Sequence, residues 1–305
     1  MSNFGRSIFS GIPVEYTIPK STQVVFVNDF FLKEVQGGAE LTSEAIIKKA
    51  PIKVFKLHSA SVTPRLLESN RDKYWIFGNF TTLPDGIVSN IPDAGIRYSM
   101  IEYDFKFCAY RSTKRHQQHT NTSCNCGSDV HGLDVTRLFK HADKIYWMSD
   151  EQKTHWLTNT KGLDDHQGHI VLSSVFDDET LDRLSALRNL PRESRSSKWA
   201  VLGAGSWIKG IEETQKWCHL HRIAFDTIPN LPYNSFLETL NGYRGLVFMP
   251  LDKDTCPRLT IEARLMGLEL KLNGNVLQQN EAWFKNSADE CEAYMRTRAS
   301  AFWNT

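Results

Sequence analysis

The stretch FMPLDKDTCPRLTIEA, residues 248–263, decides the fold of this chain. It continues the apolar run 245–249, which is typical of a strand in the middle of a parallel sheet. Pro257 suits the first turn of a helix, because its missing N–H is not needed there. Asp254 and Glu262 therefore lie on either side of a predicted helix N-terminus. Unpaired backbone N–H groups and the helix dipole favour phosphate or diphosphate at such a place, so the stretch predicts a ligand site.

A second stretch, WAVLGAGSWIKG at residues 199–210, has the same order of an apolar strand, a glycine turn and a lysine before a helical pattern. Gly205 and Ser206 lie in the turn, where glycine permits a close approach of the backbone to a ligand. Lys209 could add a positive charge for a diphosphate. A single Gly-x-Gly after a strand is a weak signal, but two such elements in one half of the chain predict a phosphate-binding site.

These residues resemble a family, the GT-B glycosyltransferases of the retaining "glycosyltransferase group 1" type. The family has two acidic residues eight positions apart, and Asp254 and Glu262 have that spacing. The resemblance implies that Asp254 supports the donor sugar and that Glu262 binds the ribose hydroxyls. It also implies that Lys209 contacts the donor diphosphate, with Gly205 and Ser206 in the turn beside it.

The first half of the chain carries further parts of this resemblance. The apolar run 24–27 and the motif Gly-Gly-Ala-Glu at 37–40 are similar to the family's first strand and its Gly-Gly loop. Gly37 and Gly38 are therefore expected to face the donor phosphates. The family frequently has a histidine in a loop near the reacting sugar, and the comparable segment here has Tyr103 and Asp104. We assign these two as candidate catalytic residues and assign no catalytic histidine.

Three departures from the family pattern bear on the site. The first acid is Asp254 rather than Glu, which shortens its reach by one methylene. The arginine that often precedes the family's lysine is absent from the glycine turn. Arg258 could substitute for it, because a guanidinium binds phosphate oxygens in a bidentate way. Pro257 removes one amide that the family often offers to phosphate.

The same residues also have simpler interpretations. Glu262 could be a stabilising acid in the first turn of a helix, and Lys209 a solvated lysine at a helix start. Glu40 could equally be a helix carboxylate or an acceptor contact. Residues 102–104 could be the polar end of a strand that pairs with Lys106.

Length and composition fit a globular two-domain protein. The chain has 305 residues, of which 41% are hydrophobic and 23% charged, and its formal net charge is +1. We expect an N-terminal acceptor-side domain at 1–160 and a C-terminal nucleotide-sugar-binding domain at 161–305, with the polar stretch 158–168 as the linker. No apolar run is long enough for a membrane span or a signal core, so we expect a cytoplasmic protein.

Short apolar runs alternate with helical patterns along the whole chain. This alternation predicts an α/β fold with two Rossmann-like domains, each with a parallel sheet and crossover helices, around an interdomain cleft. The last predicted helix, about 288–303, is expected to pack back on the first domain, as in the resembled fold. The predicted strands are Gln23–Val27, Ile52–Leu57, Tyr74–Phe77, Ile96–Ile101, Lys144–Trp147, His169–Leu172, Trp199–Leu202, Arg222–Phe225, Gly245–Met249 and Glu269–Leu272.

Residues 108–131 show little periodicity but contain several cysteines and histidines, which together could hold zinc. Cys124 and Cys126 are separated by one residue, which is closer than zinc ligands usually stand, so we expect no metal. Two other interpretations stay open, namely a long surface loop with free thiols and an acceptor-binding loop. The second rests on a local basic patch, formed by Lys106, Arg111, Lys114 and Arg115, that could meet a phosphate-bearing acceptor.

The sequence as a whole therefore predicts a glycosyltransferase that moves a sugar from a nucleoside-diphosphate sugar to an unidentified acceptor. The acceptor could be a glycan, a lipid, a protein, a small molecule or a modified nucleic acid. No cofactor is expected beyond the donor substrate, and retention of the anomeric configuration is implied by the resemblance alone. Two alternatives stay open: a non-catalytic sugar-nucleotide-binding protein, and a nucleotide-sugar epimerase on the same scaffold.

Overall fold

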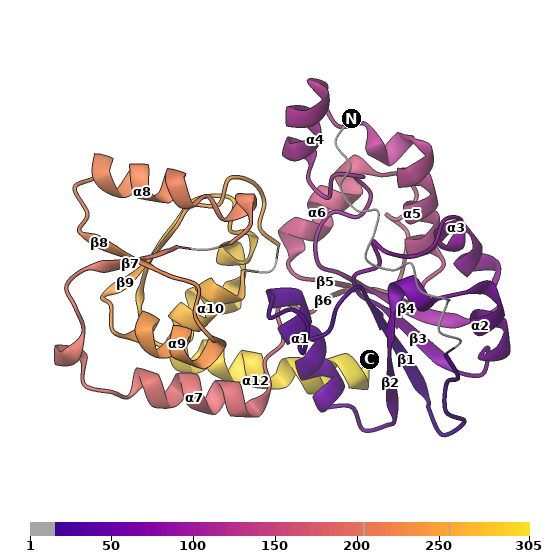
Figure 1. The fold of residues 1–305 in the computed structure, drawn as a ribbon, viewed down its shortest axis with the longest axis horizontal. Coiled ribbons are helices and arrows are strands. Elements are labelled where there is room, and N and C mark those ends of the chain that lie inside the picture. Colours follow the sequence, from indigo (N-terminus) through magenta and orange to yellow (C-terminus); the bar gives the residue numbers. More distant parts are fainter. Residues whose placement is uncertain (1–15, 204, 256) are drawn as a thin grey trace.

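The computed structural model describes residues 16–203, 205–255 and 257–305. Over this part of the chain two α/β domains lie side by side (Figure 1). The strands are β1 Val24–Asn28, β2 Val54–His58, β3 Tyr74–Phe77, β4 Arg97–Glu102, β5 Lys144–Trp147, β6 His169–Val171, β7 Trp199–Leu202, β8 Phe225–Ile228, β9 Gly245–Phe248 and β10 Glu269–Leu272. The helices are α1 Gly38–Lys48, α2 Pro64–Ser69, α3 Ile87–Asn90, α4 Thr113–Thr120, α5 Val130–Lys140, α6 Asp150–Asn159, α7 Asp178–Arg188, α8 Ile211–Leu220, α9 Tyr233–Asn241, α10 Arg258–Leu265, α11 Ala282–Lys285 and α12 Ala288–Asn304.

Each domain is built on a parallel sheet. In the described residues the first sheet has the order β2-β1-β3-β4-β5-β6 and the second has the order β10-β9-β7-β8. Strand order therefore reverses between β1 and β3 in one domain and between β7 and β9 in the other. Ligands of open α/β sheets bind beyond the carboxyl ends of the strands at such reversals. The stretches 199–210 and 248–263 follow the two strands that flank the second reversal, β7 and β9.

The ten predicted strands are all present, and β8 differs most from its predicted bounds. The prediction starts it at Arg222, but the strand begins at Phe225. Arg222 has φ +53, in the left-handed region, and the Ile223 N–H donates to the Cys218 carbonyl at 2.9 Å. These residues therefore still belong to the end of helix α8, which delays the strand by three residues.

The predicted linker at 158–168 is wrong, because this segment connects α6 to β6 within the first domain. The His166 ring lies 2.8 Å from the Ala142 carbonyl, and β6 pairs in parallel with β5. The first sheet therefore continues past the expected boundary at residue 160. The chain passes to the second domain after β6, and α7 already packs in the second core through Leu181 and Leu184.

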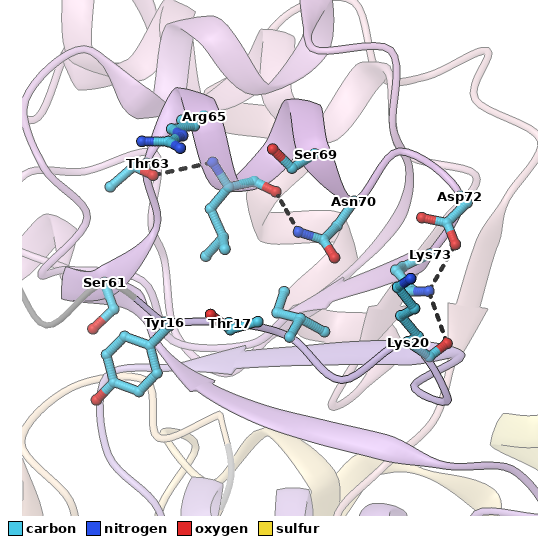
Figure 2. Close-up of a pocket in the computed structure, with 12 residues that line it drawn as sticks. Tyr16, Thr17, Lys20, Ser61, Thr63, Arg65, Ser69, Asn70, Asp72 and Lys73 are labelled. Carbon is cyan, nitrogen blue, oxygen red and sulfur yellow. Dashed lines mark hydrogen bonds and ion pairs between the residues drawn. The ribbon is translucent and has the colours of Figure 1, made fainter.

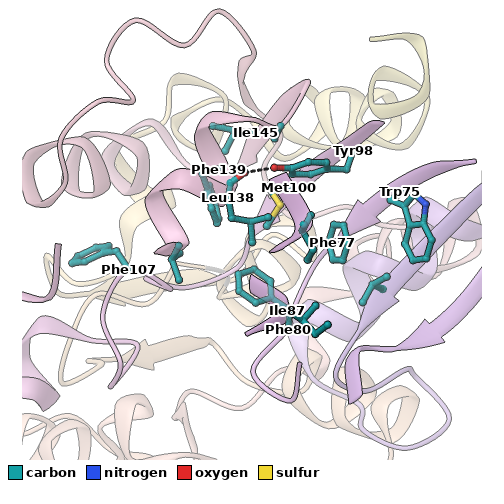
Figure 3. Packing of buried hydrophobic residues seen from close by; sticks show 14 of the residues in the cluster. Trp75, Phe77, Phe80, Ile87, Tyr98, Met100, Phe107, Leu138, Phe139 and Ile145 are labelled. Atoms are coloured by element: carbon teal, nitrogen blue, oxygen red, sulfur yellow. Dashed lines mark hydrogen bonds between the residues drawn. The ribbon is translucent and has the colours of Figure 1, made fainter. Parts of the chain in front are cut away.

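One core cluster of the first domain packs on one face of its sheet. Trp75 and Phe77 of β3 and Tyr98 and Met100 of β4 alternate along their strands, so their side chains fill one face of the sheet (Figure 3). The Tyr98 hydroxyl donates to the Leu138 carbonyl of α5 at 2.7 Å. Burial of a side chain such as Met100 stabilises the fold by about 1.5–3 kcal/mol.

Helix α12 belongs to both domains. It runs from the second domain to the first (Figure 1). Cys291 and Met295 pack in the core of the second domain, whereas Ala299 and Phe302 pack against the first sheet. The indole N–H of Trp303 donates to the Ile46 carbonyl of α1 at 2.9 Å. The last helix therefore fastens the two domains to each other. In the described residues no helix is both long and apolar enough to cross a bilayer.

Candidate functional site

The two loops predicted to bind the donor are in contact at the carboxyl ends of β7 and β9. The two strands pair in parallel, and the Leu251 N–H donates to the Ile208 carbonyl at 2.8 Å. Ala204 and Cys256 of these loops lie outside the described residues. Both loops therefore lie at one edge of the second sheet.

Two glycines make this contact possible. Gly205 has φ +146 and Gly210 has φ +61, both in the region that favours glycine. A Cβ at Gly210 would lie under 3.0 Å from the Met249 carbonyl oxygen, closer than real Cβ atoms come. The backbone of the glycine turn therefore lies directly on the strand end of β9.

Lys209 and Asp254 form an ion pair with Nζ and Oδ2 2.7 Å apart. The Lys209 side chain is 29% exposed and the Asp254 side chain 7%, so the pair lies at the edge of the cleft with the lysine outward. The ammonium also lies 5.8 Å from the centre of the Phe248 ring. Asp254 therefore fixes the position of the Lys209 ammonium. Lys209 still has solvent-facing N–H donors for an anion.

Glu262 and Arg258 form a second, more deeply buried pair at the start of α10. The Arg258 guanidinium has its Nε 3.5 Å from Oε1 of Glu262 and its central carbon 3.8 Å from the centre of the Phe176 ring. It also donates to the Val175 carbonyl. Arg258 is thus engaged with protein groups, and its predicted phosphate contact stays a prediction.

Tyr233 is a site residue that the sequence analysis missed. Its hydroxyl donates to Oε1 of Glu262 at 2.7 Å, and it begins helix α9 after the loop that follows β8. Burial raises the pKa of Glu262, although Arg258 and the Tyr233 hydrogen bond oppose that shift. Its position in the chain could have identified it, because α9 starts beyond the carboxyl end of β8, the strand next to β7.

These groups line one cavity of about 880 Å³ between the domains. From the first domain it is lined by Val35, Gln36, Gly37, Gly38 and Leu41; from the second by Leu202, Gly205, Ser206, Lys209, Pro229, Asn230, Leu231, Pro232, Tyr233, Phe236, Pro257, Arg258, Leu259 and Glu262. All seven residues predicted to bind the donor are among them. Asp254 reaches the cavity only through Lys209.

The first-domain wall of the cavity is the N-terminus of α1, which lies between the domains (Figure 1). Gly37 precedes the helix, and its N–H and that of Glu40 donate to the Glu40 carboxylate. Burial raises the pKa of Glu40, and the nearby charge of Asp29 adds to the shift. Glu40 therefore acts as a helix carboxylate here, the simpler of its two interpretations.

Tyr103 and Asp104 lie outside this cavity. Tyr103 is buried, and its hydroxyl lies 2.7 Å from the Ser43 hydroxyl. Asp104 pairs with Arg111 and, at 3.3 Å, with Lys106. Burial opposes ionisation, but these two cations lower the pKa of Asp104 to about 2. An acid held as an anion in ion pairs is poorly suited to proton transfer. The contacts of Asp104 therefore favour its simpler interpretation, as a polar residue at the end of a strand.

The basic patch expected in residues 106–115 is only partly exposed, because Lys114 and Arg115 are exposed, Arg111 is half-buried and Lys106 is buried. Lys106 is 2% exposed and packs against Glu102 and Asp104. Lys114 donates to the Leu251 carbonyl of the donor loop at 2.5 Å, and the Arg115 guanidinium lies 5.6 Å from the centre of the Trp207 ring. Helix α4 thus joins the first domain to the two donor loops.

A larger cavity of about 950 Å³ lies elsewhere, between residues 16–20 and α2 (Figure 2). Its polar side chains serve local structure. Thr63 caps α2 by accepting from the Leu66 N–H at 3.1 Å, and Lys73 pairs with Asp72 at 2.7 Å. Since none of the predicted donor-site residues lines it, the interdomain cavity is the stronger candidate site.

Solved glycosyltransferases have the same architecture over almost the whole chain. The chain is similar to Anabaena HepE in complex with UDP and glucose, at a TM-score of 0.53 and 11% identity, over 93% of this chain and 95% of that one. It is similar to AviGT4, a glycosyltransferase involved in avilamycin A biosynthesis, at 0.51 and 11%, over 92% and 93%. The apo structure of OtsA matches at 0.52 and 9%, over 91% of each chain.

No protein-family model matches the sequence, and no curated protein matches it significantly. At identities of 9–12% the structural likeness concerns the fold. The likeness agrees with three features of this chain, namely two parallel-sheet domains, an interdomain cavity and a last helix that spans both domains. This chain has the GT-B fold of the glycosyltransferases.

Proposed function

We propose that this protein transfers a sugar from a nucleoside-diphosphate sugar to an acceptor, with the donor in the interdomain cavity. The observation that carries the proposal is the convergence on one cavity of the glycine turn with Lys209, the start of α10 with Glu262, and the start of α1 with Gly37. The start of α10 presents backbone N–H groups and the positive end of a dipole, and the start of α1 adds the positive end of a second dipole. HepE, which has the same fold, was solved with UDP and glucose.

The proposed chemistry follows from where charge develops. As the bond between sugar and diphosphate breaks, the leaving group gains negative charge while the sugar becomes oxocarbenium-like. Lys209 and the amides at the helix starts stabilise the leaving diphosphate, and they are already oriented by the fold. Asp254 orients Lys209 and is the acid nearest to that ammonium, at 2.7 Å. In this mechanism no resident metal ion or further cofactor takes part, and the anomeric configuration is retained.

A panel of nucleotides and nucleotide sugars tests the proposal. A ligand present at a hundred times its dissociation constant stabilises the folded protein by about 2.7 kcal/mol, which should raise Tm by roughly 5–10 °C. We then expect slow hydrolysis of the best donor, measured as nucleoside diphosphate released. Saturable binding without any turnover would identify a sugar-nucleotide-binding protein, and recovery of an epimeric nucleotide sugar would identify an epimerase. Absence of any nucleotide-dependent shift would refute the site.

Lys209→Ala should weaken binding of the nucleoside diphosphate about tenfold to a hundredfold, because a charge-assisted hydrogen bond to phosphate is lost. Isothermal titration calorimetry with UDP or the best diphosphate of the panel measures this. Lys216→Ala is the matched control, since Lys216 lies in α8 with its side chain 69% exposed and pairs with Glu213 nearby. Equal affinity in both variants would remove Lys209 from the site.

Glu262→Gln should weaken binding of the whole nucleotide about tenfold, with a similar loss for the free nucleoside monophosphate, because an acid on the ribose acts before the sugar is transferred. The substitution keeps the shape and an acceptor for the Tyr233 hydroxyl. Glu269→Gln, at an exposed pair with Arg244 on β10, is the control. A Glu262→Gln variant that binds normally but turns over slowly would instead place this acid at the sugar.

A further inference from the structure

Four side chains from a poorly periodic part of the sequence meet in the first domain. Cys108, His116, Cys124 and Cys126 each offer one ligand atom, and these atoms all lie within 4.8 Å of one another. Cys108, His116 and Cys126 are buried, and Cys124 is partly buried. In the described residues this is the one group of histidine, cysteine and acidic side chains with such a geometry.

Three of the six separations between the ligand atoms are within about 0.5 Å of those in a tetrahedral metal site. With bonds of about 2.3 Å to sulfur and 2.0–2.1 Å to nitrogen, ideal edges are about 3.8 Å between two sulfurs and about 3.6 Å between sulfur and nitrogen. The Sγ atoms of Cys108 and Cys124 lie 3.7 Å apart. Nδ1 of His116 lies 4.0 Å from the sulfur of Cys108 and 3.2 Å from that of Cys126.

We propose that Cys108, His116, Cys124 and Cys126 bind a structural zinc ion. Three thiolates and one imidazole in a tetrahedral arrangement are a ligand set that zinc prefers, and four protein ligands leave no open position for substrate. The site is therefore structural rather than catalytic.

From the sequence no metal was expected, because Cys124 and Cys126 are only two positions apart, which is closer than zinc ligands usually stand. The fold brings Cys108 from the segment after β4 and His116 from the middle of α4, so the usual sequence spacing does not limit this site.

The ion would hold helix α4 in place. The sequence of α4 is polar, and His116 is its only buried residue. On its other side α4 contacts the second domain, where Lys114 reaches the Leu251 carbonyl and the Ser112 hydroxyl donates to Asp252. A helix this short and polar is marginal without tertiary contacts. Metal binding thus supplies the anchor from which α4 reaches the donor loops.

A disulfide is the main competing explanation for three neighbouring thiols. The 3.7 Å between the sulfurs of Cys108 and Cys124 is far longer than a disulfide bond of about 2.05 Å. A disulfide between Cys108 and Cys124 would also not account for the position of Cys126 and His116, whose sulfur and Nδ1 atoms lie 3.2 Å apart. The experiment below separates the two explanations.

The full chain is purified with reductant and without chelator, and its metal content is measured by mass spectrometry. We expect roughly one zinc per chain, and a chelator should lower Tm by roughly 5 °C or more. Cys126→Ser should lose most of the zinc. Cys218→Ser, a buried free cysteine of α8 outside the cluster, should keep it. His116→Cys, which preserves four ligands, should also keep it.

Cobalt substitution decides the case if Cys126→Ser fails to fold. Chelator-stripped wild-type protein titrated with Co²⁺ should show thiolate-to-cobalt charge-transfer absorption and the ligand-field bands of a tetrahedral ion, with an end point near one per chain. Wild-type protein with neither zinc nor these bands under reducing conditions would overturn the proposal. So would a thiol count, in denaturant without reductant, that is two short of the six cysteines in the sequence.

Discussion

Gly210→Ala is expected to destabilise the protein by about 3 kcal/mol, which would lower Tm by roughly 6–12 °C. Two costs add. The residue has φ +61, where a side chain is strained, and its Cβ would overlap the Met249 carbonyl oxygen. Relief requires the glycine turn to move away from β9, which would also displace Lys209. Nucleotide affinity should therefore fall together with stability, as measured by calorimetry and thermal unfolding.

Gly274→Ala is the matched control for this prediction. A Cβ at Gly274 would have no heavy atom within 4 Å, so this variant should unfold within about 1–2 °C of the wild type. Similar stability of the two variants would show that the turn can relax away from Met249 at little cost. Normal nucleotide affinity in Gly210→Ala would show that the turn does not position Lys209 for the ligand.

Asp254→Asn is expected to reduce the rate of donor hydrolysis about 100-fold while changing nucleotide affinity by less than about threefold. The reason is that, in the proposed mechanism, the Asp254 carboxylate holds the Lys209 ammonium against the leaving diphosphate, where charge develops in the transition state, whereas the nucleotide is bound by other groups as well. Asparagine keeps the size of the side chain and can still accept a hydrogen bond from Lys209. Steady-state kinetics of diphosphate release, with binding measured separately, gives both quantities.

Asp252→Asn provides the control on the same loop. Asp252 and Asp254 are both buried, but Asp252 accepts from the Ser112 hydroxyl of the first domain instead of pairing with Lys209. We expect this variant to retain most of its turnover. Equal losses in the two variants would mean that the loop as a whole, rather than the Asp254 carboxylate, determines the rate. A large loss of nucleotide affinity in Asp254→Asn would reverse its proposed role.

The strands and the donor loops were predictable because their signals are local. Apolar runs bounded by glycine or polar residues mark buried parallel strands, and all ten are present. Gly205, Lys209 and Glu262 lie within short motifs that follow two of these strands. The order of the second sheet then brings both motifs to one edge. The motifs lie close together because β7 and β9 are parallel neighbours, and the alternation of strands and helices in the sequence already predicts a parallel sheet.

The remaining features depend on contacts between distant segments. Helix α4 has no apolar stripe, and it forms around His116 and the Ser112 cap, which accepts from the Arg115 N–H at 2.9 Å. The metal-ligand cluster requires that helix to exist. Tyr233 reaches Glu262 only because α9 lies beside α10. The linker was misplaced because a polar stretch signals exposure, not a change of domain.

The path of α12 has a consequence for biosynthesis. Phe302 and Trp303 complete the core on one face of the first sheet, where Tyr146 packs on Phe302 with ring centres 4.4 Å apart. During synthesis the first domain therefore emerges from the ribosome well before the side chains that cover this face. Its apolar surface stays open while about 130 further residues are added, and at 5–20 residues per second that interval is on the order of ten seconds. Cotranslational chaperones could bind this apolar face until α12 packs on it.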